Sequence, residues 1–174
     1  MNIREALLEE HSRSQSDLIS AYIGNHRHRF AELISLVYTN EDPLARRAAW
    51  TMGHCCREHP ELIVPHLDRL IEFLAEPGIH PAIVRNAFLV LQTVDIPAAL
   101  QGRIFNLCYE CIDACEQTIA TRVYAMTILA GICRSEPELA GEVELLITQH
   151  FRDGSPGFKS RARHIRRELK KLRV

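Results

Sequence analysis

A helical pattern occurs three times in this 174-residue chain, with an offset of 38 residues. The clearest copy is PAIVRNAFLVLQTV at 81–94, and it returns at 43–56 and at 119–132. Small and apolar residues coincide in the three copies at helix positions 0, 1, 4 and 7. They are Ala49, Ala87 and Ala125; Trp50, Phe88 and Met126; Gly53, Leu91 and Leu129; and Cys56, Val94 and Ile132. This spacing places them on one buried stripe of an α-helix, and the fixed period predicts stacked helical repeats.

The segments between the three copies follow the same period. Leu33, Ile71, Tyr109 and Ile147 are each 38 residues apart, so we expect a repeating unit of two antiparallel helices. About four such units are expected over residues 26–156, after a capping hairpin at 1–25 and before a basic capping helix at 157–174. The predicted fold is all-α, a right-handed α–α superhelix that forms one domain.

Capping residues mark the starts of several predicted helices. Asn2 and Ser12 each precede a helix and are followed three residues later by Glu5 and Gln15, the pattern of a capping box. Asp42 followed by Pro43 predicts an N-cap with proline at the first helical position.

Composition and charge restrict the location and the partners. With 47% hydrophobic and 25% charged residues, the chain has an ordinary soluble composition. It contains neither a membrane-length apolar run nor an apolar signal region, so we expect a cytoplasmic protein without membrane contact. The net charge of −1 hides an asymmetry, since residues 157–174 hold eight basic groups and one acid, Glu168. Residues 1–156 are acidic.

The cysteines raise the question of a metal site. Cys108, Cys111 and Cys115 are spaced so that they could hold zinc or an iron–sulfur cluster. They also fall on the apolar stripe of their helix, and cysteine packs as a small hydrophobe. We therefore expect buried thiols, with no metal and no cofactor.

Two further side chains have alternative interpretations. His54 and Glu58 are one helical turn apart and could act as an acid–base pair, although a surface histidine is the more ordinary interpretation. Trp50 coincides with Phe88 and Met126 in the repeat register, which predicts a core tryptophan and not an exposed stacking platform.

The second helix of each predicted unit opens with proline or Asp-Pro, then arginine, then alanine. The residues are Asp42-Pro43 with Arg46, Arg47 and Ala49; Pro81 with Arg85 and Ala87; and Arg122 with Ala125. This pattern resembles the HEAT-like repeats of the armadillo superhelix class. The acid expected before each arginine is present at Asp42 and missing before Arg85. The resemblance implies a superhelix whose second helices line a concave face, and functions that range from transport and scaffolding to enzyme regulation and DNA repair.

The implied concave face supplies the candidate partner-binding residues. They are Arg47, Thr51, Arg85, Leu89, Gln92, Val123 and Thr127. Arginine mixed with apolar groups suits another protein, a peptide or a second copy of the chain better than a phosphate backbone. The alternative is that the arginines only bind neighbouring turns.

The first hypothesis for function is therefore a non-enzymatic module for protein–protein interaction or scaffolding. The alternative is a nucleic-acid-binding protein, similar to the alkylpurine DNA glycosylases that use HEAT-like repeats. Residues 153–161, DGSPGFKSR, resemble the glycine-serine loop of the fumarase and adenylosuccinate lyase superfamily. The continuation of that loop is absent, so we treat this similarity as chance.

The basic C-terminal helix has two interpretations of its own. A terminal repeat needs a polar outer face, which makes the helix first of all a cap. Its cations could also contact an anion, although the acidic body opposes binding along the array. We expect at most weak, salt-sensitive, sequence-independent nucleic-acid binding, through Arg163, Arg166, Arg167 and Lys170.

Overall fold

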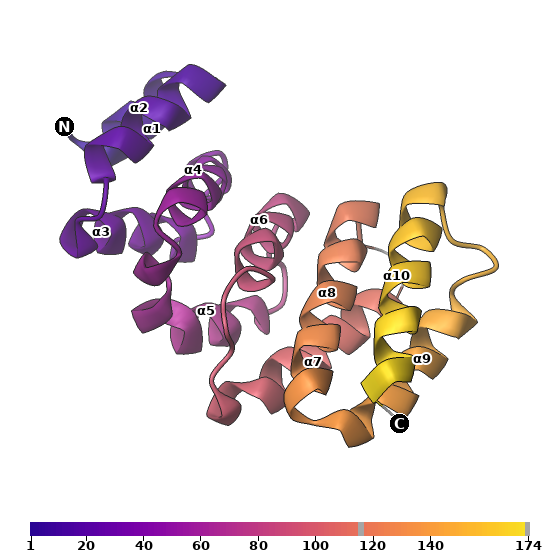
Figure 1. Ribbon diagram of the computed structural model, residues 1–174. Coiled ribbons are helices and arrows are strands. Elements are labelled where there is room, and N and C mark those ends of the chain that lie inside the picture. Colours follow the sequence, from indigo (N-terminus) through magenta and orange to yellow (C-terminus); the bar gives the residue numbers. More distant parts are fainter. Residues whose placement is uncertain (115–116, 173–174) are drawn as a thin grey trace. The chain divides into compact units, whose positions relative to one another are not determined.

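The computed structural model describes residues 1–114 and 117–172, and these residues form α-helices and short 3₁₀ turns without any strand (Figure 1). The predicted all-α repeat fold is confirmed. Packing contacts divide the chain into two compact units, Met1–Val94 and Asp95–Val174.

Unit 1 is organised around α4, which packs against α2, α3 and α6. Its helices are α1 (Ile3–Glu9), α2 (Arg13–Ile23), α3 (Arg27–Tyr38), α4 (Leu44–Glu58), α5 (Leu67–Leu74) and α6 (Pro81–Leu91). Two 3₁₀ turns, Pro60–Leu62 and Val64–His66, connect α4 to α5. The second-helix copies at 43–56 and 81–94 correspond to α4 and α6, which lie side by side (Figure 1).

Unit 2 is organised around α8, which packs against α7 on one side and α10 on the other. Its helices are α7 (Ala98–Asp113), α8 (Ile119–Ser135), α9 (Ala140–Gln149) and α10 (Pro156–Leu172). A 3₁₀ turn at Pro137–Leu139 precedes α9, and α9 packs against α10. The third copy of the pattern, at 119–132, lies within α8.

The predicted N-caps of the first two helices are confirmed, whereas the Gln15 side chain, expected to complete a capping box with Ser12, donates to the Ala6 carbonyl at 2.8 Å. The Asn2 side chain accepts a hydrogen bond from the Glu5 N–H, and the Ser12 hydroxyl accepts one from the Gln15 N–H. Each cap pairs a backbone N–H that has no partner within its helix.

The predicted cap at Asp42 is wrong. Helix α4 begins at Leu44, with Pro43 in the cap position and no side-chain cap. The Ala45 N–H, which an Asp42 cap would bind, donates instead to the Glu41 carbonyl at 2.7 Å. The Asp42 carboxylate pairs with the Arg46 guanidinium at 2.9 Å.

The repeated stripe forms the core of both units. Ala49, Ala87, Ala125 and Leu129 are fully buried, and Leu91 is 1% exposed. Burying a leucine side chain contributes about 1.5–3 kcal/mol, so the repeated positions supply much of the driving force for packing. The 38-residue register thus identified most of the buried positions correctly. It is wrong at Trp50 and Val94, which are half-buried, and Val94 lies beyond the end of α6.

Candidate functional site

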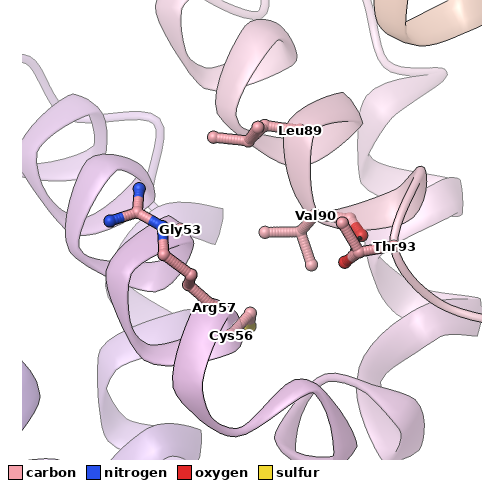
Figure 2. Close-up of a pocket in the computed structure, with 6 residues that line it drawn as sticks. All are labelled: Gly53, Cys56, Arg57, Leu89, Val90 and Thr93. Atoms are coloured by element: carbon pink, nitrogen blue, oxygen red, sulfur yellow. Dashed lines mark hydrogen bonds between the residues drawn. The ribbon is translucent and has the colours of Figure 1, made fainter.

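A small groove opens between α4 and α6 in unit 1 (Figure 2). It has a volume of about 70 Å³. Its lining residues are Gly53, Cys56 and Arg57 from α4, and Leu89, Val90 and Thr93 from α6 and the turn after it. Gly53 carries no side chain across the groove, and a Cβ placed there would lie 3.7 Å from Leu89 Cδ2. A larger residue at position 53 would therefore fill part of the groove.

The groove combines an apolar floor with a cationic edge. Cys56 and Val90 are buried, Leu89 is half-buried, and Arg57 is exposed. Figure 2 shows Leu89 and Val90 pointing from α6 toward α4. Arg85 is exposed and precedes Leu89 by one helical turn, so the two share a face of α6.

Sequence reasoning found Leu89 for this site and missed Arg57 and Thr93. Arg57 lies four residues after Gly53 and Thr93 four residues after Leu89, so the helical period offered a signal for both. Gln92, a further predicted residue, is half-buried at the C-cap of α6.

The predicted open face of α4 is wrong at Thr51. Thr51 is 1% exposed, and its hydroxyl lies 3.1 Å from the Ser16 hydroxyl of α2 and donates to the Arg47 carbonyl. Ala48 and Cys55 on the same side are also buried. The reason is that α2 packs on this side of α4. Thr51 is therefore closed to a partner.

The Arg47 side chain is hydrogen-bonded to the end of helix α1. Its Nη1 donates to the carbonyls of Leu7 and Leu8, at 2.8 and 3.1 Å. The last carbonyls of a helix have no partner within it, and Arg47 supplies one at the end of α1. Arg122 acts in the same way in unit 2, where its Nη2 donates to the Ile112 carbonyl of α7 at 3.0 Å. Both contacts support the alternative in which these arginines bind neighbouring turns.

Val123 and Thr127 lie on α8 in unit 2 and form a separate candidate pair. Both are half-buried, and the Thr127 hydroxyl donates to the Val123 carbonyl at 3.1 Å. The Thr127 hydroxyl therefore already has an acceptor within α8.

The four predicted anion-contact residues line one hollow of α10 in unit 2. The hollow has a volume of about 350 Å³ and is lined by Arg163, Arg166, Arg167 and Lys170. Phe151 lies beneath two of them, because its ring centroid is 5.5 Å from the Arg163 guanidinium and 5.8 Å from that of Arg166.

His54 does not pair with Glu58. Its Nδ1 lies 2.8 Å from Asp17 Oδ1 of α2, while Glu58 is exposed. Since His54 is 8% exposed, it joins α4 to α2 inside unit 1. The preferred interpretation of a surface histidine is therefore wrong for His54, and the alternative pair with Glu58 is not formed.

Trp50 is half-buried, so the prediction of a core tryptophan is wrong. Its ring meets the His11 and His54 rings edge-on, with centroids 5.1 and 5.4 Å away. His11 belongs to the connection between α1 and α2 and is itself exposed, so the indole lies near the surface of unit 1.

The described cysteines are buried, as predicted for Cys108 and Cys111. Burial raises the pKa of Cys55 to about 11, that of Cys111 to about 12, and that of Cys108 well above its ordinary value. Cys115, the third residue of the spacing, lies outside the described residues. Within residues 1–114 and 117–172, no three His, Cys, Asp or Glu side chains gather closely enough to hold a metal ion. The absence of a metal stays a prediction.

We expect the buried thiols to be unreactive in the folded protein. In a Cys115→Ser variant, 5,5′-dithiobis(2-nitrobenzoic acid) at pH 8 should label the five remaining thiols slowly before unfolding and completely in urea. The physical reason is that a thiol with a pKa near 11 is ionised to only about one part in a thousand at pH 8, and the thiolate is the nucleophile. Rapid labelling of even one thiol in the folded protein would contradict the packing described.

A model of the HEAT repeat domain matches residues 3–169, and the chain therefore belongs to the HEAT repeat family. Helical repeats of this kind typically mediate protein interactions. None of the curated proteins compared with the chain matches it. Among the described residues, no helix has the length and apolar character needed to cross a membrane.

Proposed function

We propose that the chain is a non-enzymatic interaction module that binds a segment of another protein in the groove between α4 and α6. The observation that carries the proposal is the groove itself, in which half-buried Leu89 lies beside exposed Arg57. An apolar depression with a guanidinium at its edge matches the composition of protein interfaces, in which arginine is enriched around an apolar centre.

The dimensions and charge of the groove define the segment that it would bind. A volume of about 70 Å³ admits one short aliphatic side chain, and burying such a side chain contributes about 1.5–3 kcal/mol. Arg57 and Arg85 offer planar donor groups that bind carboxylates at two points. The proposed ligand is therefore a segment with a small aliphatic residue flanked by aspartate or glutamate. It belongs to another cytoplasmic protein or to a second copy of this chain.

Five of the seven residues predicted for partner binding take part in the proposed contacts. Arg85, Leu89 and Gln92 belong to the proposed contact in unit 1. Val123 and Thr127 on α8 are proposed as an additional apolar contact in unit 2. Arg47 and Thr51 are left out, because Arg47 is held by α1 and Thr51 is buried.

The test is a binding experiment with matched variants. The immobilised chain captures proteins from a lysate of the source cell, and mass spectrometry identifies them. We expect at least one protein to bind the wild type and to be depleted ~10-fold or more with an Arg57→Glu, Leu89→Asp double variant. A fold-change of ten corresponds to about 1.4 kcal/mol, within reach of one lost apolar contact and one lost ion pair.

The control makes the same chemical changes in unit 1 outside the groove. Arg27 and Leu18 are both exposed, so an Arg27→Glu, Leu18→Asp variant should retain the captured protein. If the partner is a second copy, light scattering should show a wild-type dimer and a monomeric groove variant. Capture and oligomeric state that are identical in the wild type and the groove variant would rule out the proposal.

A further inference from the structure

Helix α10 presents a basic surface that the proposed peptide groove does not use. Arg163, Arg167 and Lys170 are exposed, and Arg166 is half-buried. The four residues are at helix positions 0, 3, 4 and 7, so they fall on one face, and they line the same hollow of about 350 Å³. With a rise of 1.5 Å per residue, the charges extend over roughly 10 Å of the helix.

One acidic side chain reduces the charge of this hollow. Glu144 of α9 is 14% exposed, and its Oε1 lies 3.8 Å from Arg166 Nε and 3.9 Å from Lys170 Nζ. The only acid on α10 itself, Glu168, pairs with Arg134 of α8 at 2.7 Å. Arg163 and Arg167 have no acidic partner among the residues that the structure describes. The hollow therefore holds four cations against one carboxylate.

We propose that this hollow binds the phosphodiester backbone of a nucleic acid, without reading its sequence. Three of the four cations are arginines, whose forked donors fit phosphate oxygens. The Phe151 ring lies beneath Arg163 and Arg166, and the hollow is lined by cationic side chains alone. Exposed cations that gather on one face of a helix are typical of contacts to a phosphate backbone.

The charge balance predicts how strongly binding depends on salt. Four cations less one carboxylate neutralise about three phosphates, which gives a slope of log K against log salt near −2.7 for duplex DNA. Between 50 and 200 mM salt the affinity should then fall about 40-fold. For single-stranded DNA the slope should be near −2.1. This inference is independent of the peptide groove, because the two sites lie in different units.

The experiment measures fluorescence anisotropy of a labelled 20-base-pair DNA duplex of arbitrary sequence over this range of salt. An Arg163→Gln, Arg167→Gln variant should bring the slope to about −0.9, since it removes two phosphate contacts. Glu144→Gln removes the opposing carboxylate and should steepen the slope to about −3.6 while raising affinity at 50 mM salt. A purely structural cap would show neither change.

A matched control separates the hollow from general charge. Arg152 and Lys171 are exposed and do not line the hollow, so an Arg152→Gln, Lys171→Gln variant should keep a slope near −2.7. Far-UV circular dichroism confirms that each variant is folded. The proposal is overturned by an unchanged slope in the Arg163→Gln, Arg167→Gln variant, by absent duplex binding at 50 mM salt, or by equally strong competition from polyglutamate of equal charge.

Discussion

Replacing Leu91 with aspartate is expected to lower the free energy of unfolding of unit 1 by several kcal/mol. Leu91 is 1% exposed in the core stripe of α6. Removing a buried leucine side chain costs about 2–5 kcal/mol. The introduced carboxylate adds the cost of burying a polar or charged group without a partner. Because a domain is stable by only ~5–15 kcal/mol in total, the variant should lose a large share of the stability of unit 1.

Leu89→Asp is the matched change two residues away. Leu89 is half-buried at the open groove, where water reaches a carboxylate and Arg57 lies nearby, so we expect a loss below ~1 kcal/mol. Urea unfolding followed by far-UV circular dichroism measures the free energy of unfolding of both variants. If Leu91→Asp does not fold, the milder Leu91→Ala change still gives a measurable loss. Equal losses for the aspartate variants would show that the two faces of α6 are assigned wrongly.

The repeat architecture was predictable because its cause is local and repeated. Each second helix carries a small residue and three apolar positions at helical spacing, and Ala49, Ala87 and Ala125 are fully buried in the structure. Caps such as Ser12 depend on residues three positions apart. Such short-range signals are contained in the sequence and need no knowledge of tertiary contacts.

The open face of α4 was predicted wrongly because more than one face of this helix is covered. The prediction assumed a single buried stripe, whereas α2 also packs on α4 and closes Thr51 and Cys55. The apolar character of Ala48 and Cys55 was a signal for this second contact. A repeat period describes what the units share, and α2 belongs to the capping hairpin, which the repeats do not include.

The arginines show what sequence spacing leaves open. Arg47 and Arg122 donate to backbone carbonyls at the ends of α1 and α7, while Arg85 is exposed. A carbonyl acceptor leaves no trace in side-chain identity, because every residue has one. The sequence therefore identified arginines near helix starts and could not separate those that stabilise the fold from one that is open to a partner.

Phe158→Ala is expected to be the most destabilising large-to-small change in α10, with a loss of about 3–5 kcal/mol from unit 2. Phe158 is 1% exposed, and the Arg122 guanidinium lies 4.6 Å from its ring centroid. Arg122 Nε is buried without a hydrogen-bond partner among the described residues. The guanidinium therefore depends on its contact with the Phe158 ring, and water would not replace that contact if the ring were removed. The chain also approaches the ring closely at Gly154, where an added Cβ would lie 2.6 Å from Phe158 Cδ1.

Phe151→Ala provides the control, because the same atoms are removed from a half-buried ring beneath Arg163 and Arg166. Its loss in urea unfolding should be less than half that of Phe158→Ala, since less apolar surface leaves contact and water already reaches the ring. Phe158→Leu should fall between the two and keeps the comparison measurable if Phe158→Ala does not fold. A larger loss for Phe151→Ala than for Phe158→Ala would mean that the junction of Arg122 and Phe158 does not hold α10 against α8, and that the contacts at the basic hollow stabilise unit 2 instead.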